Sequence, residues 1–460
     1  MAIGLDAYWV QFGDMKNKIL GYYESIENKV SEYADIVSVG LVDNAEAARK
    51  AAASFRTEDV DVVFCHCATY CPSDRLILAV KDIDVPVVLL NIQSVKALDM
   101  STIKEIPDFL SDGCTCACLP EMTAALARFS KRFDVITGYL TGDAETNQAL
   151  QSWCVAASVR RCLRYRNIGF VGHAFSGMLD IYVDEVELLN TLGIYTHHIE
   201  FNDIIDEAKQ ASTTDIGLWD KKFADVFGKE ERGDINVLCR YTEALQRITN
   251  KLSLFGVACH YAGNYQVEEE MVSALNPAFS MLMKSRIACT VEGDIQAAVA
   301  MFILKRILGS AMLAELYSMD FNDQTCIIGH SGAGDPDVSD ETPLLKESNV
   351  FHGRKGKGYL TQFYPKAGPV TLLALSRDDQ GFKLVAAEGI CEKGATMSIG
   401  DTNCRVRFEG GLRNFVNEWA SKGPSHHSVL GIGHDLDTIK RVAMVLRLPL
   451  SIVTVGSLGT

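Results

Sequence analysis

The chain has 460 residues, of which 48% are hydrophobic and 22% are charged, and its formal net charge at pH 7 is −15. This length exceeds the size at which a single core stops growing, so two or three domains are expected. The acidic balance argues against a nucleic-acid partner, because phosphate binding depends on a surface rich in Lys and Arg. No stretch approaches the roughly 20 uninterrupted apolar residues of a membrane span, so a membrane partner is not expected either.

Cysteine usage and the N-terminal residues point to the cytoplasm. Residues 1–16 lack the basic start and the long apolar core of a signal peptide. The 14 cysteines form no compact framework and are interpreted as reduced thiols. Two groups of them lack the CxxC spacing of structural zinc sites, and we predict that they are small buried hydrophobic residues. These groups are Cys65, Cys67 and Cys71, and Cys114, Cys116 and Cys118.

The first part of the chain alternates short apolar runs with longer amphipathic segments. The apolar runs are predicted to be buried strands and the segments between them helices. The runs lie at 35–40, 61–66, 85–93 and 133–140. This alternation is typical of a doubly wound α/β fold, and we predict such a domain over residues 1–165.

A second α/β cycle begins where an apolar run meets a glycine-rich turn at 167–178. The spacing of its glycines does not fit a dinucleotide-binding fingerprint, so we interpret the segment as a tight strand-to-helix turn. Asp294 is expected to cap a buried helix that stops at Gly309, which places Glu292 at the end of the preceding strand. We predict a second Rossmann-like domain over residues 166–312.

The last third of the chain has more glycines and hairpin-like turns. Residues 369–376 and 381–390 are predicted to pair as a hairpin, and residues 435–448 to form a closing helix. We therefore predict a mainly β, barrel-like domain over residues 313–460.

Four side chains of the kind that bind hard metal ions lie at or near the ends of apolar runs, where α/β proteins present functional groups. They are Glu292, Glu315, His330 and His427. Two carboxylates and two imidazoles suit Mn²⁺, Co²⁺ or a similar divalent ion better than they suit zinc held in a thiolate cage. Taken singly, each residue also has a structural interpretation, as a helix cap, an exposed helix or strand face, or a turn.

The order of these residues adds a further signal. The short motifs around them are Glu292-Gly293-Asp294, Ala314-Glu315-Leu316-Tyr317, Gly329-His330 and His426-His427-Ser428-Val429. Their order and spacing resemble those of the L-arabinose isomerase and L-fucose isomerase superfamily. Residues 66–74 and 135–143 are similar to first-domain segments of that family, so the resemblance extends from about Phe64 to Val429.

The resemblance implies an intramolecular oxidoreductase that interconverts a free aldose and its ketose through a metal-stabilised cis-enediolate. By this resemblance Mn²⁺, Co²⁺ or another divalent ion is bound by Glu292, Glu315, His330 and His427. The two glutamates would also be the catalytic acid and base. The implied substrate-binding residues are Gln11, Tyr70, Tyr317 and His426. A metal-dependent sugar epimerase and a non-enzymatic sugar-binding protein are the alternatives.

The identity of the sugar stays open. Arabinose isomerases carry a stretch with glutamine and histidine where this chain has the cysteine-rich residues 111–123. A pentose, a deoxyhexose and a substituted hexose, including a 6-sulfonated sugar such as sulfoquinovose, all fit. The resemblance also implies a homo-oligomer, a hexamer whose neighbouring subunits share their active sites.

Overall fold

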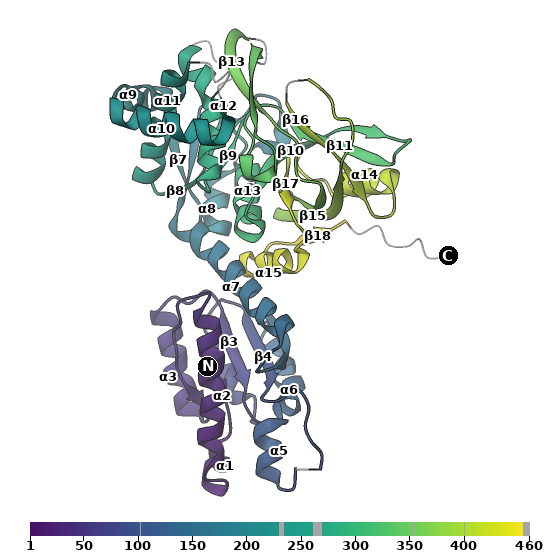
Figure 1. The fold of residues 1–460 in the computed structure, drawn as a ribbon. Helices are drawn as coiled ribbons and strands as arrows, with labels where there is room; N and C mark the ends of the chain where they lie inside the picture. Colours follow the sequence, from purple (N-terminus) through teal and green to yellow (C-terminus); the bar gives the residue numbers. More distant parts are fainter. Residues whose placement is uncertain (102, 230–233, 261–268, 352–353, 400, 454–460) are drawn as a thin grey trace. The chain divides into compact units, whose positions relative to one another are not determined.

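The computed structural model describes residues 1–453 apart from 102, 230–233, 261–268, 352–353 and 400 (Figure 1). The chain divides into two compact units, Met1–Arg161 and Cys162–Thr460. The first unit contains one parallel sheet, and the second contains a parallel sheet followed by a closed β-barrel. The predicted fold class, two Rossmann-like α/β parts and a barrel-like β part, is confirmed, while the predicted domain bounds stay predictions.

The sheet of the first unit is parallel throughout, with the strand order β2-β1-β3-β4-β5. Its strands are β1 (Ala2–Ile3), β2 (Leu41–Val42), β3 (Val63–Cys67), β4 (Val87–Gln93) and β5 (Phe133–Tyr139). The helices are α1 (Asp6–Gln11), α2 (Met15–Ser31), α3 (Ala45–Thr57), α4 (Asp74–Val80), α5 (Ile106–Asp112), α6 (Thr115–Arg128) and α7 (Ala144–Tyr165), which contains the point of division. Strand β4 is buried along nearly its whole length, as expected of a parallel strand whose two faces are both covered.

The strand predicted at 35–40 is wrong. These residues have no regular structure, and the nearest strand, β2, lies at Leu41–Val42. Gly40 precedes it with a φ of +70°, a left-handed conformation that interrupts an extended run. The sequence pattern also gives no sign of β1, because a strand of two residues is too short to show a periodicity.

The cysteines of the first unit are mostly core residues, as predicted. Both groups are buried with the exception of Cys116, which is exposed. Cys116 lies on helix α6, where residues two apart point about 200° away from each other, so it does not share the buried face of Cys118. All 14 cysteines of the chain are free thiols.

His66 on β3 gives the first unit a pH-dependent stability. Its ring is buried, with Nε2 3.1 Å from the backbone oxygen of Ile92. Burial lowers the pKa of His66 to about 4, because the charged imidazolium is poorly solvated there. The unfolded chain takes up this proton near pH 6.5, so the stability due to neutral His66 is complete above that pH and is lost as the pH falls towards 4.

We expect the free energy of unfolding to fall by about 3 kcal/mol through this one group as the pH is lowered across that range. His66→Gln should remove this part of the pH dependence, which urea unfolding at several pH values would measure. His198→Gln, at an exposed histidine, is the matched control. Equal pH dependence in His66→Gln and the parent protein would contradict the prediction.

The second unit begins with a parallel sheet of order β7-β6-β8-β9. Its strands are β6 (Asn167–Val171), β7 (Tyr195–Ile199), β8 (Leu254–Cys259) and β9 (Ala288–Thr290). The helical segments are η1 (Leu179–Ile181), α8 (Glu185–Leu192), α9 (Phe201–Lys209), α10 (Thr213–Phe227), α11 (Ile235–Lys251), α12 (Glu269–Lys284) and α13 (Ile295–Leu308). The predicted glycine-rich turn follows β6. No helix in the described ranges is both long and apolar enough to span a membrane.

The barrel follows α13. Its strands have the order β14-β17-β10-β11-β16-β15-β18, and a further pairing of β14 with β15 closes the sheet. They are β10 (Ala311–Asp320), β11 (Thr325–His330), β14 (Gly368–Asp378), β15 (Gly381–Glu392), β16 (Thr402–Phe408), β17 (Ser428–Ile432) and β18 (Leu450–Ile452). The remaining elements are η2 (Pro336–Val338), the hairpin of β12 (Leu344–Phe351) and β13 (Arg354–Gln362), α14 (Leu412–Ser421) and α15 (Leu436–Leu446).

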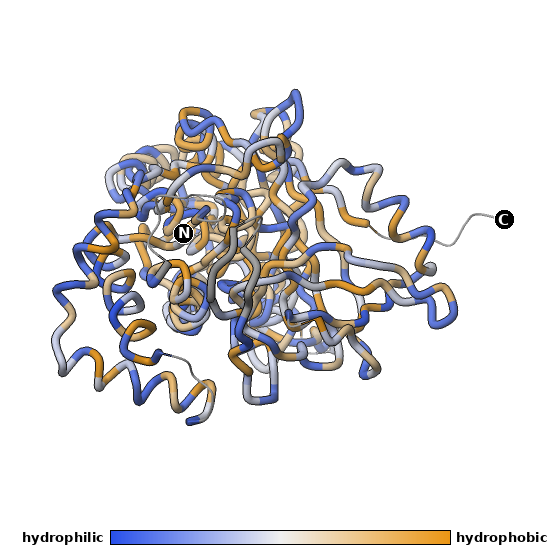
Figure 2. The backbone as a smooth tube through the Cα atoms, turned by 90° about the horizontal axis from the view of Figure 1, so that it is seen from above, coloured by the Kyte–Doolittle hydropathy of each residue, from blue (hydrophilic) through white to orange (hydrophobic). Residues whose placement is uncertain are grey.

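Two local predictions in the barrel are confirmed. Strands β14 and β15 form the expected hairpin, with Asp378 paired to Gly381 across the turn. Helix α15 is the expected closing helix. Figure 2 shows hydrophilic residues gathered in outer turns of the chain, as expected where hairpin turns meet solvent.

Helix α13 connects the two parts of the second unit. Asp294 caps it, with Oδ1 accepting from the N–H of Ala297 at 2.8 Å, and it ends before Gly309, as predicted. The helix is buried nearly throughout and contacts β8 and β9 of the parallel sheet as well as β10, β14 and β17 of the barrel. Near its end, Lys305 forms a buried ion pair with Asp335.

Candidate metal centre

Strand register in the barrel brings three of the four predicted ligands side by side. Strand β17 begins directly after His427, and its pairing with β10 places His427 next to Glu315. Strand β11 ends at His330. Gly329, the residue before His330, pairs with Glu315 on β10, which places His330 near Glu315. These strands are antiparallel and belong to the barrel (Figure 1), so the three residues do not lie at the carboxyl ends of a parallel sheet.

The fourth predicted ligand comes from the turn between β9 and α13. Glu292 has a left-handed φ of +61°, which is unfavourable for a residue with a side chain. Gly293 follows with a φ of +72°, where a Cβ atom would lie 2.4 Å from the carbonyl oxygen of His173. The backbone N–H of Phe175 donates to the carbonyl oxygen of Glu292 at 2.9 Å. Close packing therefore holds this turn in a strained conformation, which is common at functional sites.

His427 lies close to each of the other three predicted ligands, and it belongs to two groups whose possible ligand atoms lie within 4.8 Å of one another, Glu315–His330–His427 and Glu292–His426–His427. We call Glu292, Glu315, His330 and His427 the four-ligand cluster. The Nε2 atoms of His330 and His427 are 3.2 Å apart. His427 Nε2 also lies 3.3 Å from Glu292 Oε2 and 3.5 Å from Glu315 Oε1. A divalent ion with bonds of about 2.0–2.2 Å needs donors within about 4.4 Å of one another, so these separations fit such an ion.

The hydrogen bonds around the two histidines place a proton on each Nδ1, so Nε2 is the acceptor of each ring when that ring is neutral. His427 Nδ1 lies 2.8 Å from Asp294 Oδ2, and His330 Nδ1 lies 2.6 Å from the backbone oxygen of Ser331. Each Nδ1 carries a proton to donate in these bonds, so in the neutral rings each Nε2 has a lone pair. Two lone pairs and two carboxylates then face one another and need a positive centre among them. Metal-bound histidines are held in the same way, by a carboxylate or a carbonyl oxygen at the other ring nitrogen.

The electrostatics of the cluster favour a positive charge. Burial lowers the pKa of His427, but hydrogen bonds with Asp294 and Glu292 outweigh burial and raise the pKa to about 10. Burial, together with the neighbouring His427, lowers the pKa of His330 to about 4, so His330 is neutral and available as a ligand. Either a proton on His427 or a divalent ion supplies the positive charge that the two carboxylates require.

His426 and Tyr317 lie beside the cluster. His426 Nε2 is 3.6 Å from Glu315 Oε1, and its Nδ1 is 2.6 Å from Asp180 Oδ2. The hydroxyl of Tyr317 donates to Asp401 at 3.0 Å, and burial together with Asp401 raises the pKa of Tyr317. His426 is therefore within reach of a small ligand at the cluster, and the substrate-binding roles of both residues stay predictions.

The other two predicted substrate-binding residues belong to the first unit. Gln11 is the last residue of α1 and is exposed. Tyr70 is half-buried, and its hydroxyl lies 3.5 Å from Glu121 Oε2. The other oxygen of Glu121 accepts from the N–H of Ser73 at 2.8 Å, so the carboxylate is held next to the segment that carries Tyr70. The substrate-binding roles of Gln11 and Tyr70 stay predictions.

The sequence pattern does not reveal the hydrogen bonds that three carboxylates make at the site. Asp180 in η1 and Asp401 before β16 lie in segments without a recognisable motif. Asp294 is predictable as a helix cap, but its second oxygen bonds His427, 133 residues further along the chain. Asp180 likewise bonds His426 across 246 residues, and hydrogen bonds from His426 outweigh burial to hold the pKa of Asp180 below its usual value. Only the Glu-Gly-Asp motif offered a signal, and it did so for Asp294 alone.

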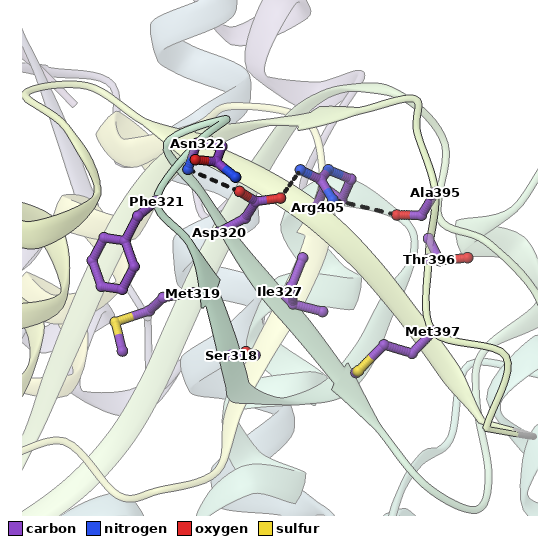
Figure 3. Close-up of a pocket in the computed structure, with 10 residues that line it drawn as sticks. All are labelled: Ser318, Met319, Asp320, Phe321, Asn322, Ile327, Ala395, Thr396, Met397 and Arg405. Atoms are coloured by element: carbon purple, nitrogen blue, oxygen red, sulfur yellow. Dashed lines mark hydrogen bonds and ion pairs between the residues drawn. The ribbon is translucent and has the colours of Figure 1, made fainter.

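A separate cavity of about 470 Å³ lies near the turn of the β10–β11 hairpin (Figure 3). Its lining includes the apolar side chains of Met319, Phe321 and Met397. Arg405 also lines it and is ion-paired with Asp320 at 2.7 Å. No member of the four-ligand cluster lines this cavity, so we do not connect it with the metal centre.

Residues 310–448 match the family described as the L-arabinose isomerase C-terminal domain. This segment contains Glu315, His330 and His427, whereas Glu292 precedes it. The chain is also similar to the sulfoquinovose isomerase of Priestia megaterium, with 21% identity over 235 residues, or 50% of this chain and 52% of the relative. A match of the same extent exists to the sulfoquinovose isomerase of Priestia aryabhattai.

A third relative is the sulfoquinovose isomerase of Alkalicoccus urumqiensis, which is 19% identical over 289 residues. That alignment covers 62% of this chain and 64% of the relative. The chain spans about half the length of the first two relatives it matches.

Proposed function

Because the chain is a divergent member of the L-arabinose and L-fucose isomerase superfamily, we propose that it interconverts a free aldose and its ketose at a divalent metal bound by the four-ligand cluster. The observation that carries this proposal is the convergence of two imidazole lone pairs and two carboxylates, with His427 and His330 oriented by Asp294 and the Ser331 carbonyl. Two neutral imidazoles and two carboxylates offer four lone-pair atoms to a cation, which would take the place of the proton that raises the charge of His427 in its absence.

The proposed reaction moves a proton from C2 of the aldose to C1 and the hydroxyl proton from O2 to O1, and it needs a stabilised cis-enediolate. A bound divalent ion supplies that stabilisation as a Lewis acid. Glu292 and Glu315 are proposed as the acid and base, because ionised carboxylates beside the reacting carbons can take up a proton and return it.

The substrate is proposed to be a pentose, a deoxyhexose or a substituted hexose. Sulfoquinovose is the first candidate to test, since three relatives are named sulfoquinovose isomerase. Mn²⁺ or Co²⁺ is the proposed ion, because mixed carboxylate and imidazole ligands suit both. Cytoplasmic localisation and a homo-oligomer, a hexamer with shared active sites, stay predictions.

Metal analysis followed by NMR of free sugars in D₂O would test the proposal. We expect the purified protein to bind about one divalent ion per chain and to lose activity when a chelating resin removes it. Added Mn²⁺ or Co²⁺ should restore the activity. One sugar of a panel that includes sulfoquinovose, pentoses and deoxyhexoses should convert to its ketose and incorporate deuterium.

Other outcomes would select the alternatives. Inversion at one carbon without movement of the carbonyl group would indicate a sugar epimerase. No turnover of any sugar, with or without either ion, would contradict the proposal and favour a sugar-binding protein.

A further inference from the structure

Asp180 lies outside the four-ligand cluster and holds the histidine next to it. Its Oδ2 accepts three hydrogen bonds, from His426 Nδ1 at 2.6 Å, from the backbone N–H of His426 at 2.8 Å and from the hydroxyl of Ser425 at 3.2 Å. These bonds fix both the backbone and the ring of His426. A single carboxylate oxygen therefore determines how this imidazole is oriented.

The segment that carries Asp180 is itself fixed from helix α13. Gln296 is fully buried, and its Nε2 donates to the backbone oxygen of Asp180 at 2.7 Å. Gln296 lies two residues after Asp294, which holds His427. The first turn of α13 thus supports both adjacent histidines, His427 directly and His426 through Asp180.

The orientation of His426 makes its Nε2 available to a ligand. With the Nδ1 proton donated to Asp180, the neutral ring has its lone pair on Nε2. That atom lies 3.6 Å from Glu315 Oε1, and one ring nitrogen of His426 lies within 4.8 Å of ligand atoms of Glu292 and His427. The ring packs against His427, with centroids 4.0 Å apart, yet the side chain is 35% exposed. A sugar hydroxyl at the metal centre can therefore donate to Nε2.

We propose that Asp180 is a positioning residue, which holds His426 with Nε2 as the hydrogen-bond acceptor for a substrate hydroxyl beside the metal centre. This inference rests on the proposed function for the identity of the ligand. The orientation of the ring does not depend on it, and can be measured in the protein without metal or sugar. Asp180 acts through His426, so the effects of replacing the two residues should not be independent.

The first test is the tautomer of His426, measured by NMR of protein labelled with ¹⁵N-histidine at about pH 9, above the usual imidazole pKa. His426→Gln identifies the signal. The parent protein should show protonated Nδ1 and unprotonated Nε2. Asp180→Ala should shift His426 towards the opposite tautomer, and Asp180→Asn, which preserves the shape of the side chain, should show a smaller shift. An unchanged tautomer in both variants would overturn the proposal.

The second test compares single and double variants in the isomerisation assay. Asp180→Asn should lower kcat by roughly 10- to 100-fold and change KM less, with metal content retained. The Asp180→Asn, His426→Gln double variant should be no slower than His426→Gln alone. Multiplicative losses would show that Asp180 acts independently of His426 and would overturn the proposal.

Glu185→Gln is the matched control. Glu185 accepts from an exposed histidine, His198, at 3.0 Å, so this variant removes a comparable carboxylate–histidine bond that involves neither Asp180 nor the four-ligand cluster. It should leave the His426 signal and kcat unchanged. If no sugar is turned over, the proposed function fails, while the tautomer measurement still decides whether Asp180 positions His426.

Discussion

Glu315→Gln should abolish the exchange of the substrate C2 proton with solvent deuterium while the fold is retained. Glutamine has nearly the same shape but cannot take up a proton, so the loss should be roughly 10²- to 10⁴-fold in rate. Glu292→Gln should behave in the same way, since the two carboxylates lie on either side of His427 Nε2 at 3.3 and 3.5 Å. Proton NMR of the sugar in D₂O at saturating Mn²⁺ would measure the exchange.

Two precautions show whether slower exchange comes from the missing base: the assay uses saturating metal, and a control variant changes a glutamate at the surface. A glutamine ligand also weakens metal binding, so bound metal should be quantified in each variant. Glu418→Gln on helix α14 is the matched control, because Glu418 pairs with Lys422 at the surface and belongs to none of the motifs. It should exchange at the parental rate. Undiminished exchange in both Glu292→Gln and Glu315→Gln would remove these glutamates from the mechanism.

Lys305→Met should destabilise the second unit by about 3–5 kcal/mol, because it leaves the carboxylate of Asp335 buried without its cation. The side chains of Lys305 and Asp335 are 3% and 0% exposed. Asp335 would still accept from the N–H groups of Ala311 and Asp337, but these neutral donors do not replace a charge. The midpoint of urea unfolding would measure the loss.

Removing the charges of both Lys305 and Asp335 should destabilise the second unit less than removing the charge of Lys305 alone. The Lys305→Met, Asp335→Asn double variant has no uncompensated charge and should be more stable than Lys305→Met alone. Lys440→Met is the control, since Lys440 pairs with Asp437 at the surface of α15 and should contribute less than about 1 kcal/mol. If Lys305→Met lowered the free energy of unfolding by as little as Lys440→Met does, that result would contradict the assignment of a buried, stabilising pair.

Local signals explain which elements were predictable. The helix α13 follows from Asp294, an apolar run and Gly309, and the β14–β15 hairpin follows from two apolar runs around a short polar turn. All of these signals lie within a few residues of the element that they define. The wrong strand at 35–40 shows the converse, because its apolar residues are partly exposed and Gly40 turns the chain before the true strand begins.

The site was predictable only as far as its motifs reach. The four predicted ligands and their order are visible in the sequence, and the structure places His330, Glu292 and Glu315 at 3.2, 3.3 and 3.5 Å from His427. The residues that orient them are separated from their partners by long stretches of chain, as Asp294 is from His427 and Asp180 from His426. No periodicity or spacing rule relates residues so far apart, since only the packed fold makes them neighbours.

The start of helix α13 limits how this architecture can be recombined in evolution or design. The family segment at 310–448 contains three members of the four-ligand cluster, but the fourth, with Asp294 and Gln296, belongs to the preceding turn and helix. A barrel transplanted on its own would lose one proposed ligand together with the supports of both adjacent histidines. The smallest transferable unit therefore includes α13 and the strand that leads into it.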